Sequence, residues 1–345
     1  MPQKNKYELS IIIPVYNEES YLNKLFKQIL YFFNSEDVEV IIVNDGSTDR
    51  SKEIIENFKI KENIKFSLKI IHLDKNFGKG KAVREGINNS TGQYVILQDA
   101  DLELDLKDAK ELSNIIKSNE EIKCIFGSRY SSGKLKKHSY FSNELIGKIN
   151  SFIFNIFFGQ SLSDIHCGLK ILHRDVVENI KLSINDFGLE IDLASQIVRN
   201  NFYIYEFGVS YYSRTRVEGK KITWIDGVKS YYYLFKVRFL DNPISIKISL
   251  IYSCIYMIYV GSYFGMGLGK TLFMIAFFII GLVIGLKNKL LSSSFIFLSI
   301  YIGSLFGKGQ GKVLAVLIFF ILGLYLAKKI SKFINNKIPN LDYLI

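Results

Sequence analysis

Three carboxylates crowd into one five-residue stretch, at Asp99, Asp101 and Glu103. Like charges this close repel each other unless a cation lies between them. Hard divalent cations such as Mg²⁺ and Mn²⁺ prefer oxygen ligands and bridge protein carboxylates to substrate diphosphates. The stretch therefore predicts a divalent-metal site. The alternative is a solvated turn that carries a helix-capping aspartate.

Two further polar stretches have the residue types that bind a nucleotide. Residues 76–81 read Asn-Phe-Gly-Lys-Gly-Lys, and backbone N–H groups and lysines at the start of a helix can hold phosphate. The spacing is not that of a P-loop, and an exposed glycine turn is the alternative. Asp45 follows an apolar run. It could accept a hydrogen bond from a base N–H, or it could be a turn residue ahead of Gly46.

An alternation of strands and helices must position these residues. Short apolar runs predict buried strands, and apolar residues recurring at helical spacing predict helices. The predicted strands are 9–13, 38–43, 68–73, 94–97 and 124–126, and the helical stretches are 22–33, 54–58, 82–88 and 112–116. This order predicts an α/β fold with a mostly parallel sheet. Ligands of such sheets bind beyond the carboxyl ends of the strands, where all three polar stretches fall.

The net charge of +11 is distributed unevenly along the 345 residues. Residues 244–345 contain ten Lys, no Arg and one acid, Asp342, which gives +9, whereas residues 1–243 contain 34 bases and 32 acids, which gives +2. Apolar sequence punctuated by Lys is typical of a membrane anchor. We therefore expect a membrane partner and no nucleic acid.

Four apolar stretches predict a C-terminal, all-α transmembrane region, at residues 244–264, 271–286, 290–306 and 313–327. A span needs about 17–25 apolar residues, so the first qualifies clearly and two or three spans are the alternative. The distribution of Lys predicts a cytosolic N-terminal domain and an integral protein of the inner (cytoplasmic) membrane. The expected domains are a cytosolic domain at 1–225, a juxtamembrane interfacial helix at 226–243 and an anchor of four helices at 244–345.

The polar stretches together resemble a known family. Residues 10–130 closely resemble the family 2 glycosyltransferases, which have the Rossmann-like GT-A fold. Within that family, residues 8–240 look most like the dolichyl-phosphate mannose or glucose synthases and their bacterial polyprenyl-phosphate relatives. The wider resemblance rests on residues 14–18, 44–49, 78–80, 99–101 and 127–130, and the narrower one adds 163–164, 167–170, 187–190, 214–215 and 218–222.

The resemblance implies an activity. A single sugar of the mannose or glucose class would move from a nucleotide-diphosphate sugar, of the GDP-mannose or UDP-glucose class, to a polyprenyl phosphate of dolichyl or undecaprenyl type. The reaction would use Mg²⁺ or Mn²⁺ and would invert the anomeric carbon. Such an acceptor suits the chemistry, because a phosphate monoester is already anionic at neutral pH and needs no strong base. The sequence is also compatible with a homo-oligomer.

The resemblance also implies roles for individual residues. Pro14, Tyr16, Glu18 and Asp45 would hold the base and ribose, and Lys79 would approach the diphosphate. Asp99, Ala100 and Asp101 would lie at the nucleotide and the metal, with Glu103 as a further metal ligand. The expected phosphate-binding residues are Arg129, Arg214, Lys220 and Lys221.

Three of these assignments leave alternatives open. Many synthases have Arg-x-x-Gly-x-Ser-Lys where this chain reads Arg-Val-Glu-Gly-Lys-Lys at 216–221. Arg214 and Arg216 are therefore both candidates for the phosphate clamp, as are Lys220 and Lys221. The expected catalytic residues are Asp101, Arg129, Asp164, Arg214 and Lys221. Asp164 and Glu190 could orient sugar hydroxyls or make structural hydrogen bonds.

Two stretches predict surfaces at the bilayer. Apolar residues recur at helical spacing over 145–157, with polar residues between them, which suggests an amphipathic interfacial helix. Tyrosines at 231–233 and Phe235 are interleaved with Lys229, Lys236 and Arg238, which suggests a second aromatic surface. A core-facing helix is the alternative in each case.

Two other functions compete with single-sugar transfer. A processive polysaccharide synthase is disfavoured because Gln196 and Arg199 are followed by Asn200 rather than the Trp of the Gln-x-x-Arg-Trp motif. An inactive glycosyltransferase-like membrane scaffold or lipid-carrier transporter is disfavoured because the acidic and phosphate-binding residues form a full set.

Overall fold

The computed structural model describes residues 6–61, 64–131, 133–137, 140–215, 217–220 and 224–241. Among these residues no helix is long and apolar enough to cross a membrane. The predicted anchor at 244–345 lies outside the described residues, as do Lys221 and Arg216.

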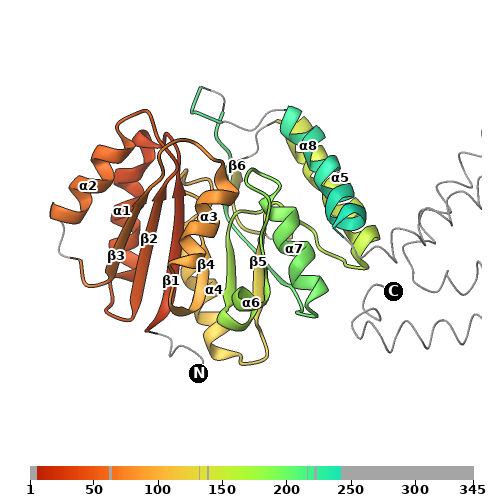
Figure 1. Ribbon diagram of the computed structural model, residues 1–345, viewed down its shortest axis with the longest axis horizontal. Helices are drawn as coiled ribbons and strands as arrows, with labels where there is room; N and C mark the ends of the chain where they lie inside the picture. The colour runs from red at the N-terminus through yellow and green to blue at the C-terminus, as the bar shows by residue number, and fades with distance from the viewer. Residues whose placement is uncertain are drawn as a thin grey trace, which may run out of the picture. The chain divides into compact units, whose positions relative to one another are not determined.

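A seven-stranded sheet forms the centre of the domain (Figure 1). β1 pairs in parallel with β2 and β4, β2 with β3, and β5 with β8, whereas β7 runs antiparallel between β4 and β5. In spatial order the strands are β3 (Ser67–His72), β2 (Val38–Asn44), β1 (Tyr7–Val15), β4 (Gly92–Leu97), β7 (Lys170–His173), β5 (Cys124–Ser128) and β8 (Tyr205–Gly208). A separate parallel pair joins β6 (Lys136–Lys137) to β9 (Tyr211–Tyr212).

Helices cover both faces of the sheet (Figure 1). They are α1 (Glu19–Phe33), α2 (Ser51–Lys61), α3 (Lys79–Asn88), α4 (Leu106–Ser118), α5 (Phe141–Phe158), α6 (Arg174–Asn179), α7 (Leu189–Arg199) and α8 (Trp224–Phe235), followed by a π-helical turn at Lys236–Leu240. Side chains alternate along a strand. Thus Ile11 and Ile13 join the large core beneath α1, α2 and α4, while Ile41 and Val43 pack with Ala82 of α3 on the other face.

The α/β prediction with a mostly parallel sheet is confirmed, and each predicted strand lies within or overlaps an observed one. The antiparallel strand β7 was not predicted, because its four residues are too short a run to identify as a strand. Its reversal has a consequence for the site. Leu97 at the end of β4 pairs with Lys170 at the start of β7, so the loop before β7 reaches the same edge as the carboxyl ends of the parallel strands.

The chain divides into two compact units, Met1–Asn155 with Ser161–Phe235, and Ile156–Gln160 with Lys236–Ile345. In the first unit, α5 and α8 lie side by side (Figure 1). A Cβ on Gly227 of α8 would meet the Ile146 side chain of α5 at 3.2 Å. The absence of a side chain at this position therefore allows the two helices to approach closely.

Candidate active site

A cavity of about 540 Å³ opens at the carboxyl edge of the sheet. Its volume falls in the usual range for small-molecule sites, about 300–1,000 Å³. The predicted site residues that line it are Pro14, Tyr16, Glu18, Asp45, Lys79, Asp99, Ala100, Asp101, Glu103, Arg129, Glu190, Arg214 and Lys220. Residues from seven separate stretches of sequence therefore meet at the edge where the polar stretches were expected.

Asp45 fixes the glycine-rich loop in place. Its two carboxylate oxygens accept hydrogen bonds from the backbone N–H groups of Phe77 and Gly78, at 2.9 and 2.8 Å. Gly78 has φ of +99°, a conformation that favours glycine, and a Cβ there would lie 2.5 Å from the Asn185 carbonyl oxygen. Two of the N–H groups expected to cradle phosphate are thus engaged by Asp45.

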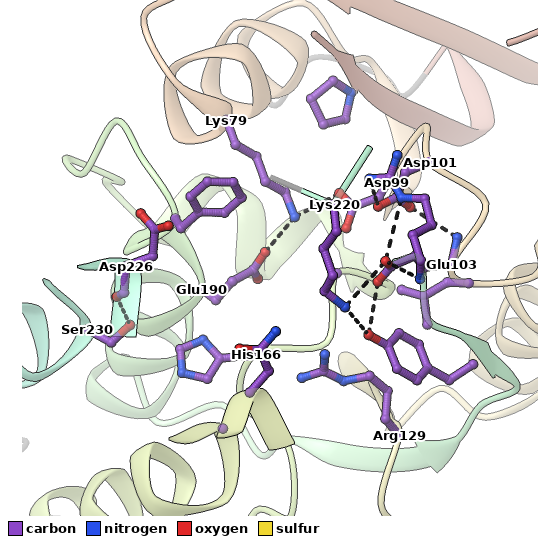
Figure 2. Close-up of a pocket in the computed structure, with 18 of the residues that line it drawn as sticks. Lys79, Asp99, Asp101, Glu103, Arg129, His166, Glu190, Lys220, Asp226 and Ser230 are labelled. Atoms are coloured by element: carbon purple, nitrogen blue, oxygen red, sulfur yellow. Dashed lines mark hydrogen bonds and ion pairs between the residues drawn. The ribbon is translucent and has the colours of Figure 1, made fainter. Parts of the chain in front are cut away.

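Lys79 lies in a chain of alternating charges (Figure 2). Its Nζ is 2.7 Å from Asp99 Oδ1 and 2.9 Å from Glu190 Oε1, and the other Glu190 oxygen accepts a hydrogen bond from the fully buried Lys170. Burial opposes the charge on Lys79, but the Asp99 and Glu190 carboxylates outweigh it and raise the pKa of Lys79. Burial likewise acts to raise the pKa of Glu190, and the two lysines outweigh it and lower that pKa. Lys79 and Glu190 are therefore both held ionised.

The approach of Asp99 to this chain depends on a glycine. A Cβ on Gly168, in the loop before β7, would lie 2.0 Å from Asp99 Oδ2. Any side chain at position 168 would therefore displace the Asp99 carboxylate.

Arg214 neutralises the acidic stretch from the opposite direction. Its Nη1 is 2.9 Å from Glu18, its Nη2 is 2.8 Å from Asp101 and its Nε is 3.5 Å from Glu103. Burial and the nearby Asp99 charge raise the pKa of Asp101 to about 7, against the opposing effect of Arg214. One guanidinium is therefore shared among three carboxylates.

Arg129 is held by Asp164. Its Nε and Nη2 donate to the two Asp164 oxygens at 2.7 and 2.8 Å, and its backbone N–H donates to Oδ2 at 3.0 Å. Burial acts to raise the pKa of Asp164, but Arg129 outweighs it and lowers that pKa. A fully buried carboxylate in a bidentate pair has little freedom to contact a sugar. The geometry thus favours the structural alternative for Asp164.

The Asp164 loop has its own anchor. Glu206 of β8 accepts hydrogen bonds from the backbone N–H groups of Ser163 and Asp164, at 2.9 and 3.1 Å, and from the Ser163 hydroxyl at 3.0 Å. Glu206 therefore supports the loop that orients Arg129.

The side of the cavity away from the strand ends is formed by α5 and α8. Gly147 and Asn150 of α5 line it, as do Asp226 and Ser230 of α8. The Asn150 amide lies 3.1 Å from Nε2 of His166. Burial lowers the pKa of His166 to about 4, so this imidazole is neutral at physiological pH.

Other faces of the same helices are exposed and apolar. The exposed fractions are 80% for Phe141 and 64% for Phe152 of α5, and 55% for Tyr232 and 47% for Phe235 of α8, while Leu145 and Ile149 complete the stripe on α5. The core-facing alternative is therefore wrong for these residues. Arg238, in contrast, was expected at the surface but is buried, with an exposed fraction of 2%.

The metal prediction fits two of its three residues. Among the described residues, no group of three His, Cys, Asp or Glu side chains is arranged to hold a metal ion. Mg²⁺, however, commonly takes only one or two carboxylates and completes its shell with water and substrate phosphates. Asp99 and Asp101 both line the cavity and supply two carboxylates there. The role of Glu103 as a ligand stays a prediction.

Several residues of the site were not foreseen from the sequence. Lys170 and Glu206 lie in strands whose pattern reads as ordinary core, and Tyr211 and Asn150 have no motif around them. His166 also lines the cavity. Charged residues inside short apolar strands were the one available signal, since such groups are rarely buried unpaired.

Comparisons with known proteins agree with this geometry. The model of glycosyl transferase family 2 matches residues 10–181. The chain is 27% identical to a dolichyl-phosphate beta-glucosyltransferase of Dictyostelium discoideum, over 64% of this chain and 70% of that protein. It is 28% identical to a dolichol-phosphate mannosyltransferase of Pyrococcus furiosus, over 62% of this chain and 60% of that protein.

Solved structures share the fold. Glucosyl-3-phosphoglycerate synthase from Mycobacterium tuberculosis, in complex with Mn²⁺, uridine diphosphate and glucosyl-3-phosphoglycerate, superposes with a TM-score of 0.52 at 14% identity, over 68% of this chain and 80% of that one. Sequence and fold together lead to one conclusion: this chain belongs to glycosyl transferase family 2 and is a glycosyltransferase similar to the polyprenyl-phosphate sugar transferases.

Proposed function

We propose that this enzyme transfers a single sugar of the mannose or glucose class from a nucleotide-diphosphate sugar to a polyprenyl phosphate, with inversion at the anomeric carbon. The main support for this proposal is the position of α5 and α8. Each helix lines the charged cavity on one face and exposes apolar or aromatic side chains on another. An amphipathic acceptor, with a phosphate head and a hydrocarbon tail, matches these two surfaces.

The donor would bind at the strand ends. Tyr16 and Glu18 lie at the end of β1 and would hold the base and ribose, while Asp45 keeps the glycine-rich loop closed beside them. Asp99 and Asp101 would hold Mg²⁺ or Mn²⁺, which would neutralise the charge of the leaving diphosphate. Lys79 of α3 lies at the same place. Its ammonium would leave Asp99 and bind the diphosphate instead.

The acceptor phosphate would bind among the remaining cations. Arg129 and Lys220 both line the cavity, and Asp164 holds the Arg129 guanidinium in one orientation. An oxygen of the lipid phosphate would attack the anomeric carbon as the bond from that carbon to the nucleoside diphosphate breaks. No proton needs to be removed from the attacking oxygen, so positioning and charge neutralisation supply most of the catalysis.

The protein would be integral to the cytoplasmic membrane, with the catalytic domain in the cytosol. The basis is the sequence of residues 244–345 together with the exposed aromatic faces of α5 and α8. The names of the Dictyostelium and Pyrococcus relatives specify dolichyl or dolichol phosphate as acceptor, which supports a lipid phosphate here.

The test uses the full chain in detergent or liposomes. Labelled GDP-mannose, UDP-glucose and other nucleotide sugars are offered with polyprenyl phosphate, with and without Mg²⁺ or Mn²⁺. We expect one donor to give a single-sugar lipid phosphate, and we expect EDTA to abolish its formation. A long polymer would support a processive polysaccharide synthase. No turnover with any donor would support an inactive scaffold or lipid-carrier transporter.

A further inference from the structure

Glu103 is surrounded by hydrogen-bond donors. Its Oε1 accepts from the backbone N–H of Arg214 at 2.9 Å, and its Oε2 accepts from the Tyr211 hydroxyl at 2.9 Å. The ammonium of Lys220 and Nε of Arg214 each lie 3.5 Å from Oε1. Glu103 thus accepts two hydrogen bonds from residues 211–214 and lies at ion-pair distance from two cations (Figure 2).

The backbone around Glu103 is attached to the same segment. The N–H of Tyr212 donates to the Glu103 carbonyl at 2.9 Å, and Leu104 forms an isolated β-bridge with Tyr211. Lys220 in turn donates to Ser213 Oγ at 2.7 Å and to the Tyr211 hydroxyl at 3.2 Å. The turn after β4 thus holds residues 211–214 in place. Through this segment it also positions Arg214 and Lys220.

The other two acids of the stretch have different partners. Asp99 receives the flexible Lys79 ammonium, and Asp101 receives one Arg214 Nη2 and one backbone N–H, that of Glu103. Side-chain cations can swing away when a metal arrives. A rotation of the Glu103 carboxylate towards a metal would disturb both hydrogen bonds and leave the buried Arg214 N–H without its acceptor, which is unfavourable.

We infer that Glu103 is a positioning residue rather than a metal ligand: it fastens residues 211–214 to the end of β4 so that Arg214 and Lys220 face the phosphate groups. This inference rests on the proposed function for the identity of the phosphate, and it deepens that function by naming what sets the two cations in place.

The experiment compares Glu103→Gln and Tyr211→Phe, singly and together, in the full chain. Asp101→Asn is the reference for a lost metal ligand. Glu111→Gln is the matched control, since Glu111 also pairs with a lysine, Lys134, and lies outside the cavity. Three quantities are measured: Mn²⁺ affinity by electron paramagnetic resonance with UDP or GDP present, the binding of farnesyl phosphate by calorimetry, and KM and kcat for the polyprenyl phosphate.

Glu103→Gln should raise the acceptor KM and weaken farnesyl phosphate about tenfold, since hydrogen bonds to charged groups contribute about 1.5–3 kcal/mol. Its Mn²⁺ affinity should stay within about twofold of the parent, whereas Asp101→Asn should weaken Mn²⁺ more than tenfold. Tyr211→Phe should show a smaller loss of the same kind. The double variant should be no worse than Glu103→Gln alone, because the two groups act through one contact.

Two results would overturn the inference. One is a loss of Mn²⁺ affinity in Glu103→Gln as large as that in Asp101→Asn. The other is unchanged farnesyl phosphate binding in Glu103→Gln. If the parent protein binds Mn²⁺ and farnesyl phosphate but transfers no sugar, the proposed function fails, while the two binding measurements still decide the role of Glu103.

Discussion

The two halves of the cavity are built in different ways. The strand-end half consists of residues that directly follow β1, β2 and β4, such as Glu18, Asp45 and Asp99. The cationic half consists of Arg129, Arg214 and Lys220, and partners from remote parts of the chain hold each of them. Parallel strands fix the first half through the backbone. The second half depends on ion pairs, and changes in sequence can alter it without changing the sheet.

The largest effect is expected in the strand-end half, from Asp101→Asn. Loss of this carboxylate should lower turnover about a thousandfold, because it removes charge stabilisation of the leaving diphosphate. Single-turnover transfer with a labelled donor measures the loss, and co-sedimentation with liposomes checks that membrane insertion is intact. Retained turnover would contradict the assignment of Asp101 as a metal ligand.

The buried charge chain should give the largest change in stability. Lys170→Met leaves Glu190 with one cation fewer and should lower the free energy of unfolding by about 3 kcal/mol. Lys81→Met is the matched control, since Lys81 pairs with Glu85 at i,i+4 on a helix surface, where such a pair contributes less than about 0.5 kcal/mol. Thermal unfolding of the two variants in detergent measures the difference. Equal shifts in melting temperature would mean that the buried charges contribute no more to stability than a surface ion pair.

A smaller and more selective effect is expected in the cationic half. Arg129→Lys keeps the charge but loses the bidentate pair with Asp164. It should raise the acceptor KM about tenfold and leave the donor KM unchanged. Arg174→Lys is the control, because Arg174 donates to the Gly92 carbonyl at the opposite edge of the sheet. If Arg129→Lys instead raises the donor KM alone, Arg129 belongs with the donor phosphates.

The last effect concerns His166 and appears only below neutral pH. Burial lowers its folded-state pKa to about 4, whereas the unfolded value is about 6.5. Between these values the unfolded chain binds more protons, so this contribution to stability is present above pH 6.5 and is lost as the pH falls towards 4. Stability curves from pH 4 to 7 should be flatter for His166→Gln than for the parent. Parallel curves would contradict the assigned pKa.

The sequence predicted the strand-end half well and the cationic half poorly. Asp45, Asp99 and Asp101 lie within four residues of a strand end, so topology alone brings them together. The partners of the cations could not be found in this way. Asp164 and Arg129 are 35 residues apart and Glu103 and Arg214 are 111 apart, and only tertiary packing determines which acid meets which base. The antiparallel strand β7, which carries Lys170, was missed because its four residues are too short a run to identify.

The Asp99–Lys79–Glu190–Lys170 chain has a consequence for altering the enzyme. Two acids and two bases sum to zero, so the core beneath the cavity is neutral as long as its members change in pairs. A single replacement leaves one buried charge without its counterpart, whereas a joint replacement of Glu190 and Lys170 by apolar residues of similar size preserves the balance. A change at Lys79 that aims to alter donor preference therefore requires a compensating change of charge in the residues at β4, β7 and α7.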